Sequence, residues 1–260
     1  MKIGNLYFEL AGLVIQFILH PTKNVVGQQI FVSNLNKYWG QFKINNKKAD
    51  CKVFVKEFGY KIFRDKNNYY LNKYRKLGNR YELAYSTSAL DIDLVLRDIL
   101  MEKQKYDSLI LHASAVTNRK GDVYVFIAKS GGGKSTVAKN LEKVGYKIIA
   151  DDAVVFRKLN GSWTIYSTPF LEKTKYPTKK HLNKIVLFRI HKSDECQSTV
   201  FSNQFAVIKN IADSLWTRNS DLGKTTLSNI MHLASNVKMY DLFVNLKPKD
   251  IQKEIEKCTN

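Results

Sequence analysis

The stretch that decides the fold spans residues 122–152 and reads DVYVFIAKSGGGKSTVAKNLEKVGYKIIADD. Residues 123–127 alternate in a pattern typical of a buried β-strand. Three glycines follow at 131–133, and the next segment carries apolar residues at the spacing of one helix face. A second short apolar run then ends in an acidic pair, Asp151 and Asp152. The predicted order is therefore strand, glycine-rich loop, helix, strand and acidic pair.

This order is the layout of a phosphate-binding P-loop, a motif that requires a strand before it and a helix after it. Glycines let several backbone N–H groups converge on one anion, and the helix N-terminus adds partial positive charge. Lys134 can reach the β- and γ-phosphates of a nucleotide, and the Ser135 hydroxyl can ligate Mg²⁺. The predicted phosphate-binding residues are Ser130, Gly131, Gly132, Gly133, Lys134, Ser135 and Thr136.

The acidic pair adds candidate metal-binding and proton-accepting groups to this loop. A carboxylate at the end of the next strand can hold the metal or take a proton from an attacking hydroxyl. The motif is imperfect, because Ala128 occupies the position of its first glycine. The alternative is a glycine-rich turn before an ordinary helix, with Asp151 and Asp152 at a solvated strand end. The strand before and the helix after the loop favour the P-loop.

Composition limits the partners. The chain has 260 residues and a net charge of +19, with basic residues spread along its length. This charge suits an acidic partner such as a nucleotide, an acidic peptide, a nucleic acid or a membrane surface, although a generally lysine-rich composition explains it equally well. The sequence contains no helix-turn-helix, zinc or RNP-like motif, so no specific nucleic acid is expected. The three cysteines lack zinc or disulfide spacing, which fits a reducing cytoplasm.

The N-terminal part is expected to be rich in β-structure. The apolar run Leu6–Leu19 is short and interrupted by polar residues, so a hairpin is predicted in place of membrane insertion. Short strands follow to about Tyr85, among them Gln28–Val32, which a short helix from Ser33 to Trp39 would follow. A helix is predicted from Leu90 to Lys103. The predicted domains are a β-rich N-terminal domain, 1–100, and a nucleotide-binding domain, 101–260.

A strand is predicted from Ser108 to Val116, and it contains His112. The turn sequence at 118–121 joins it directly to the P-loop strand, which predicts an antiparallel hairpin. A lone histidine in a strand is more often structural than catalytic. Beyond the acidic pair we expect a hairpin at 154–167, a basic loop at 173–184, a strand at 185–190, helices at 204–215 and 225–234, a strand at 239–246 and a helix at 250–258.

Three separated features carry a resemblance to a known family: the segment LHASAV at 111–116, the GGGKST loop, and the acidic pair on the next strand. Together they resemble the HPr kinase/phosphorylase family and its smaller HPr-kinase-like serine kinases. The resemblance implies that Lys134 and the loop amides bind ATP, and that Ser135 and Asp152 lie at Mg²⁺. It also implies that Asp151 is the general base and His112 an active-site histidine.

Two departures narrow the predicted function. Thr136 stands where HPr kinases tend to have glutamate, and the second family signature has only a weak counterpart at 201–211. We therefore expect an acceptor other than HPr. The prediction is an α/β, HPr-kinase-like P-loop enzyme that phosphorylates a serine or threonine of a peptide or small protein, as in modified-peptide biosynthesis. The alternatives are a nucleotide-binding switch and a kinase for small hydroxyl compounds. The sequence leaves a homo-oligomer open.

Overall fold

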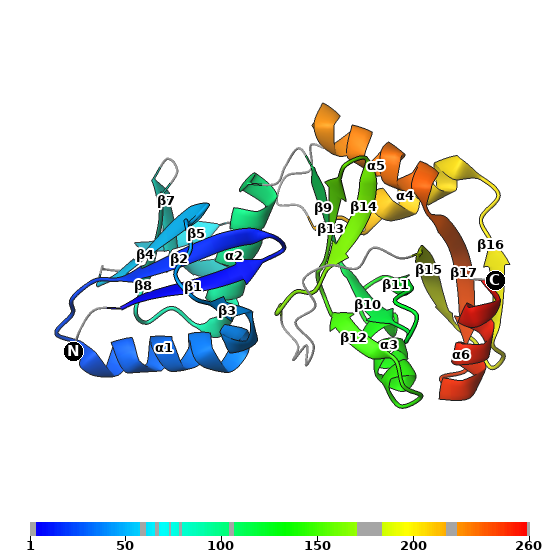
Figure 1. Ribbon diagram of the computed structural model, residues 1–260, viewed down its shortest axis with the longest axis horizontal. Helices are drawn as coiled ribbons and strands as arrows, with labels where there is room; N and C mark the ends of the chain where they lie inside the picture. The colour runs from blue at the N-terminus through cyan, green and yellow to red at the C-terminus, as the bar shows by residue number, and fades with distance from the viewer. Residues whose placement is uncertain are drawn as a thin grey trace. The chain divides into compact units, whose positions relative to one another are not determined.

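A computed structural model describes residues 4–57, 61–65, 68–72, 74–77, 80–103, 107–170, 184–216 and 223–258 (Figure 1). The chain divides into two compact units, Met1–Leu100 and Met101–Asn260. Each unit combines helices with β-sheets, so the protein is mixed α/β. No helix within the described ranges is long and apolar enough to cross a membrane.

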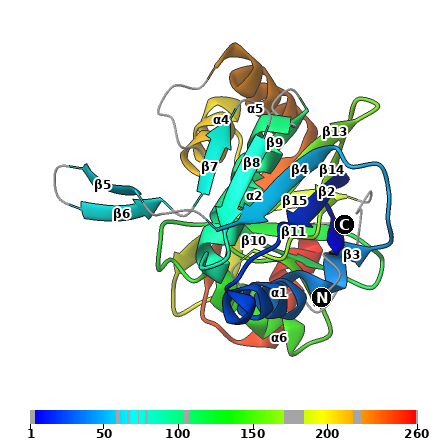
Figure 2. The same cartoon turned by 90° about the vertical axis from the view of Figure 1, so that its left-hand side faces the viewer.

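The first unit is built on a six-stranded sheet in the order β3-β1-β2-β4-β8-β7. Its strands are β1 (Asn5–Leu10), β2 (Leu13–Leu19), β3 (Lys43–Ile44), β4 (Cys51–Lys56), β7 (Tyr74–Leu77) and β8 (Arg80–Ala84). A separate hairpin, β5 (Lys61–Asp65) with β6 (Asn68–Asn72), extends away from this sheet (Figure 2). The 3₁₀ turn η1 spans Gly40–Phe42, and α2 (Ala89–Lys103) follows the sheet.

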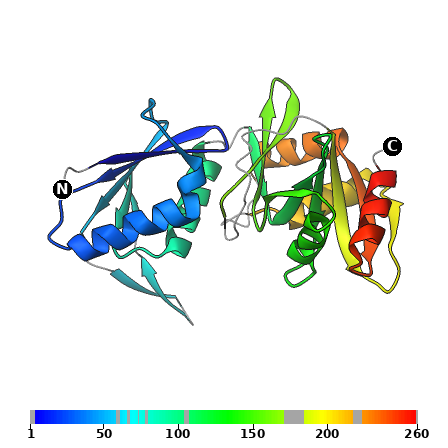
Figure 3. The same ribbon diagram turned by 60° about the horizontal axis from the view of Figure 1, so that its bottom comes forward.

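The predicted strand Gln28–Val32 is wrong. This segment belongs to one long helix, α1 (Val25–Trp39), which runs along the sheet (Figure 3). The Asn24 side chain accepts a hydrogen bond from the Gly27 backbone N–H and caps the helix. The helix therefore begins at Val25, well before the cap expected at Ser33. Every fourth residue from Phe31 is buried, the spacing of a helix face, and the β-branched residues nearby concealed that signal.

The second unit contains a six-stranded sheet in the order β12-β10-β11-β15-β17-β16. Its strands are β10 (Ala113–Thr117), β11 (Val123–Ile127), β12 (Lys147–Ala150), β15 (Ile185–Lys192), β16 (Gln197–Val200) and β17 (Lys238–Val244). A smaller sheet has the order β14-β13-β9, from β9 (Ser108–Leu111), β13 (Val154–Leu159) and β14 (Ser162–Tyr166). The expected hairpins β10–β11 and β13–β14 are confirmed.

Four helices cover the two faces of the six-stranded sheet. They are α3 (Lys134–Glu142), α4 (Gln204–Asp213), α5 (Lys224–Asn236) and α6 (Pro248–Lys257). Strand side chains alternate between the faces: Tyr124 and Phe126 pack in one core with α3 and α6, whereas Val123 and Val125 pack in the other with α4 and α5. The predicted helices and the closing strand are confirmed, and the basic segment expected at 173–184 lies outside the described residues apart from Lys184.

The strand predicted from Ser108 to Val116 is interrupted at His112. Before this residue β9 pairs with β13 in the smaller sheet, and after it β10 pairs with β12 in the larger one. Their partner strands, β12 and β13, are likewise joined by residues 151–153. Two neighbouring antiparallel chain segments therefore pass from the larger sheet to the smaller one at the same corner. The His112 backbone N–H donates to the Ser214 carbonyl at 2.7 Å, which replaces the ladder bond that the bend removes.

Candidate active site

Strand direction brings the predicted site residues to one edge of the six-stranded sheet. Strand β11, which precedes the glycine-rich loop, is antiparallel to β10 and parallel to β15, and β12 is antiparallel to β10. The carboxyl ends of β11, β12 and β15 therefore meet at the edge where β10 begins. This edge carries the glycine-rich loop at 128–133. The acidic pair and His112 lie on one side of the loop, and the end of β15 lies on the other.

The loop has the backbone shape that its glycines were expected to provide. Gly131 and Gly133 have φ of +73° and +94°, a region that side chains disfavour, and Gly133 is the N-cap of α3. At Gly132 the constraint is space, because a Cβ would lie 2.6 Å from the Ala128 Cβ and 2.8 Å from the Lys129 carbonyl oxygen. Ala128 itself is not among the residues with positive φ, so it fits the first-glycine position without strain.

Lys134 folds back over this loop. Its Nζ donates to the carbonyl oxygens of Ala128 at 3.1 Å and Lys129 at 3.5 Å, and only 7% of the residue is exposed. Burial lowers the pKa of Lys134, and the nearby carboxylates of Asp152 and Asp151 oppose that shift. The structure thus places one buried amine between the glycine-rich loop and the acidic pair.

Asp151 is the best-anchored acid of the site. The residue is 4% exposed, and its Oδ1 accepts hydrogen bonds from the Ser135 hydroxyl at 2.9 Å and the Asp152 backbone N–H at 3.1 Å. The buried Ser114 hydroxyl donates to the same oxygen. Sequence reasoning missed Ser114, since a small serine within an apolar strand is common in cores. Its place two residues after His112 was the available signal.

Asp152 faces a different partner. Its Oδ1 lies 3.3 Å from His112 Nε2, and the two side chains are 24% and 37% exposed. Asp152 has a φ of +66°, in the left-handed region that aspartate tolerates better than most residues. The turn at the strand end directs the two adjacent carboxylates to two different partners, Ser135 and His112.

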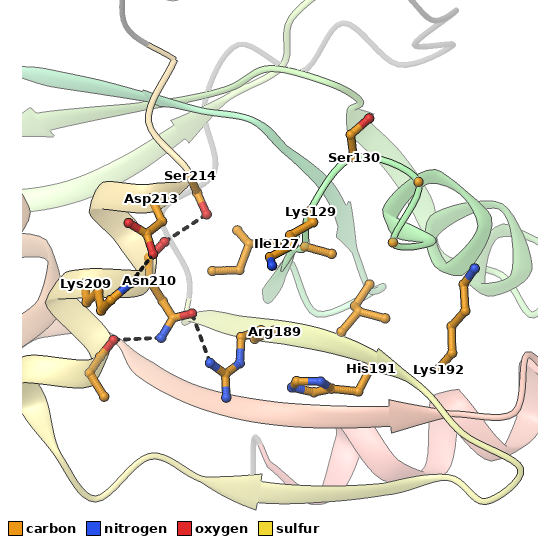
Figure 4. Close-up of a pocket in the computed structure, with 15 residues that line it drawn as sticks. Ile127, Lys129, Ser130, Arg189, His191, Lys192, Lys209, Asn210, Asp213 and Ser214 are labelled. Atoms are coloured by element: carbon orange, nitrogen blue, oxygen red, sulfur yellow. Dashed lines mark hydrogen bonds and ion pairs between the residues drawn. The ribbon is translucent and has the colours of Figure 1, made fainter. Parts of the chain in front are cut away.

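The structure brings five of the predicted site residues together and leaves two at the margin. The five are His112, Lys134, Ser135, Asp151 and Asp152. Thr136 is exposed in the first turn of α3, and Ser130 is exposed at the loop, where its side chain points away from Asn210 and Arg189 (Figure 4).

A pocket of about 870 Å³ adjoins the other side of the loop (Figure 4). It lies between the loop residues 128–132, the end of β15 at 189–192, and α4 with Ser214. Sequence reasoning did not find this pocket, because its walls come from segments far apart in the chain. A weak sign was the basic end of β15.

Arg189 is fixed in this pocket by Asp241 of the neighbouring strand β17. Its Nε and Nη2 donate to the two oxygens of Asp241 at 2.6 and 2.9 Å, and its Nη1 donates to Asn210 Oδ1 at 3.3 Å. His191 Nε2 also lies 2.5 Å from Asp241 Oδ1. Burial raises the pKa of Asp241, but the hydrogen bonds from Arg189 and His191 outweigh it and leave the pKa below its ordinary value.

Comparisons with known proteins add little to this geometry. No protein-family model matches the chain, and no curated protein matches it. Among solved structures, the chain is similar to the Hpr(Ser) kinase/phosphatase from Coxiella burnetii, with 10% sequence identity and a TM-score of 0.34. That similarity covers 58% of this chain and 99% of the other. A TM-score of this size carries no conclusion about the site.

Proposed function

We propose that this chain is an ATP- and Mg²⁺-dependent kinase that transfers the γ-phosphoryl group to a serine or threonine hydroxyl of a peptide or small protein. One observation supports the proposal above all. A buried lysine at the end of a glycine-rich loop, a serine hydroxyl at a helix start and two carboxylates lie at one sheet edge. Phosphoryl transfer needs positioning and charge stabilisation, and these are the groups that supply them.

The loop residues fit the phosphates of ATP. Gly131 and Gly133 have positive φ, a backbone conformation in which N–H groups can converge on an anion, and the α3 N-terminus adds its partial charge. The Gly132 N–H donates within the loop, to the Lys129 carbonyl at 2.9 Å. Lys134 already lies over the loop, where its Nζ donates to the carbonyl oxygens of Ala128 and Lys129, which a phosphate would outcompete for an ammonium. We therefore expect these residues to bind the nucleotide without rearrangement of the strands.

The oxygen ligands fit Mg²⁺ held together with a nucleotide. Within the described part of the chain no group of three or more His, Cys, Asp or Glu side chains could hold a metal alone. Mg²⁺ is usually held by one or two carboxylates plus substrate phosphates, so Ser135 with the acidic pair suffices. Bound there, Mg²⁺ would neutralise charge on the phosphates.

The contacts suggest a division of labour between the two carboxylates. The family resemblance puts the general base at Asp151 and the metal at Asp152. Yet Asp151 is the acid that bonds Ser135, the expected metal ligand, while the more exposed Asp152 pairs with His112. The contacts thus favour Asp152, oriented by His112, as the group that accepts the hydroxyl proton, and Asp151 as the metal-side acid. The two assignments predict different variants and can be separated.

The identity of the acceptor rests on the resemblance and on charge. The net charge of +19 favours an acidic acceptor, and a cytoplasmic site suits the free cysteines of the described residues. A kinase for small hydroxyl compounds or a nucleotide-binding switch would use the same loop. These alternatives predict ATP binding without label on a peptide.

The direct test is transfer from γ-labelled ATP with Mg²⁺ to a panel of serine- and threonine-containing peptides, followed by mass spectrometry. We expect label on a peptide hydroxyl. Lys134→Ala should abolish the nucleotide-dependent signal, and Lys253→Ala, on the exposed face of α6, is the matched control. Nucleotide binding with label on small hydroxyl compounds alone would contradict the peptide acceptor. No nucleotide binding at all would contradict the kinase proposal.

A further inference from the structure

The pocket beside the loop shares residues 130–132 with the predicted phosphate site, but its walls from β15 and α4 have been given no role so far. The carboxylates lie on the β12–β10 side of the P-loop strand, whereas the pocket opens on the β15 side. It is large enough for several side chains of a ligand, and a hydrogen bond from Arg189 of β15 to Asn210 of α4 joins two of its walls. A concave site of this size next to reacting groups is a candidate for substrate binding.

The lining of this pocket is cationic. Lys129, Arg189, Lys192 and Lys209 line it, and Asp213 is the acid among its lining residues. Asp213 is paired with Lys209 at 2.6 Å, and Asp241 behind the pocket is paired with Arg189 at 2.6 Å, so two of the four positive charges are balanced. Lys129 and Lys192 are exposed and form no ion pair with any residue that the structure describes. The pocket therefore retains positive charge after its internal pairing.

Arg189 adds geometry to this charge. Asp241 holds two of its nitrogens and the Phe201 ring lies 4.8 Å from its guanidinium carbon, so the side chain is fixed before any ligand arrives. Its remaining nitrogen, Nη1, faces Asn210 across the pocket. Asn210 Nδ2 in turn donates one N–H to the Ala206 carbonyl at 2.8 Å. The second N–H of Arg189 Nη1 and that of Asn210 Nδ2 are suited to bind a carboxylate oxygen.

We propose that this pocket binds the phosphoryl acceptor and selects one that carries carboxylates close to its hydroxyl, as an acidic serine or threonine peptide does. The inference rests on the proposed kinase function and names the substrate class for that same site. A nucleotide is the competing occupant, because loop residues 130–132 also line this pocket, and the test below separates the two. The pocket places acidic flanking residues beside Lys192 and Arg189 while the hydroxyl reaches over the loop.

The test uses three synthetic peptides with one serine, flanked by Glu, by Gln or by Lys. Binding to the full-length protein is followed by fluorescence anisotropy without nucleotide, and phosphorylation by label transfer from ATP with Mg²⁺. We expect the Glu peptide to bind about tenfold more tightly than its Gln analogue, a difference that shrinks as salt is raised. The Lys peptide should bind more weakly than both.

Charge reversal at the pocket sharpens the test. Lys192→Glu replaces an exposed side chain, so the fold should be retained, and it should weaken binding of the Glu peptide about threefold to tenfold. The same variant should improve binding of the Lys peptide. Lys253→Glu introduces the same charge on α6, away from the pocket, and should change neither peptide. Thermal unfolding of both variants checks that the fold is intact.

The outcomes separate this inference from the kinase proposal. Charge-dependent peptide binding without phosphoryl transfer would support the binding pocket and contradict the proposed kinase activity. Transfer to all three peptides alike, unchanged in Lys192→Glu, would support the kinase and overturn the acceptor pocket. If Lys192→Glu weakens ATP binding and leaves the peptide preference intact, the pocket holds the nucleotide and the inference is wrong.

Discussion

The two sides of the glycine-rich loop are built in different ways. On one side, residues between 112 and 152 form a compact set in which a buried carboxylate accepts hydrogen bonds from Ser114 and Ser135. On the other, Arg189, Asn210 and Asp241 come from three separate elements around an open pocket. In the proposed function, the first arrangement would fix atoms for chemistry, and the second would offer charge to a ligand. This contrast indicates that reaction and recognition are separable, and substitutions can test that separation.

The largest effect is expected from the acidic pair. Removing a general base typically lowers kcat by about 10²- to 10⁴-fold while the nucleotide still binds. If Asp152 is the base, Asp152→Asn shows this loss together with near-normal Mg²⁺·ATP affinity, whereas Asp151→Asn weakens binding of Mg²⁺·ATP. If Asp151→Asn loses kcat with near-normal Mg²⁺·ATP affinity and Asp152→Asn weakens Mg²⁺·ATP binding, Asp151 is the general base. Label transfer and nucleotide titration at several Mg²⁺ concentrations distinguish the two, with Asp107→Asn, an exposed acid just before β9, as the control.

A smaller effect is expected within the loop itself. Gly132→Ala places a Cβ against Ala128 and the Lys129 carbonyl, so the loop must shift and the nucleotide affinity should fall. Overpacking of this kind typically costs about 1–3 kcal/mol. The double variant with Ala128→Gly removes one of the two contacts and should recover part of the loss, which nucleotide titration would show. Equal affinity for Gly132→Ala and the original chain would contradict the tight approach.

On the pocket side, Asp241→Asn should change recognition more than chemistry. Arg189 loses its carboxylate partner and its fixed orientation, so the KM for an acidic peptide should rise a few-fold while kcat changes little. Steady-state kinetics with the Glu-flanked peptide measures this split. A fall in kcat with KM unchanged would show that the pocket side takes part in the reaction and would contradict the separation of reaction from recognition.

The smallest effect is on stability in acid. Because the pKa of Asp241 is lowered in the folded protein, its ion pairs stabilise the fold above the ordinary value of 3.8, and this contribution is lost as the pH falls through the lower folded value. The pairs are partly exposed, so the effect is modest. Thermal unfolding across acid pH should show the original chain losing its advantage over Asp241→Asn. A difference that is constant with pH would rule out this ion pair as its source.

The parts of the fold that sequence predicts well are those with a local signal. The P-loop strand, its helix and the N-terminal hairpin each follow from short-range periodicity and glycine placement, and the structure confirms those elements. The first half of helix α1 was missed, because its start depends on the Asn24 cap and the residues after the cap include β-branched ones, whereas the helix expected from Ser33 to Trp39 is its second half. The break at His112 was missed because apolar residues continue through it while the strand changes sheet.

The same distinction applies to the candidate site. Motif spacing led to Lys134, Ser135 and the acidic pair, and the structure brings them together. Arg189 and Asp241 lie on neighbouring strands but are separated in the sequence by two helices, so no spacing rule connects them. Their pairing arises from strand order alone. Recognition residues that depend on tertiary neighbours therefore stay invisible in a single sequence.

The corner at His112 couples the arrangement of the two sheets to the candidate active site. His112 and Asp152 lie where the two paired chain segments pass from the larger sheet to the smaller one, so a change in the angle between the sheets would change the distance between imidazole and carboxylate. The smaller sheet is tied at its far strand to α5, where the Trp163 indole N–H donates to His232 at 2.9 Å. A protein or ligand that tilts this sheet would thus alter the carboxylate geometry from a distance, without touching the loop.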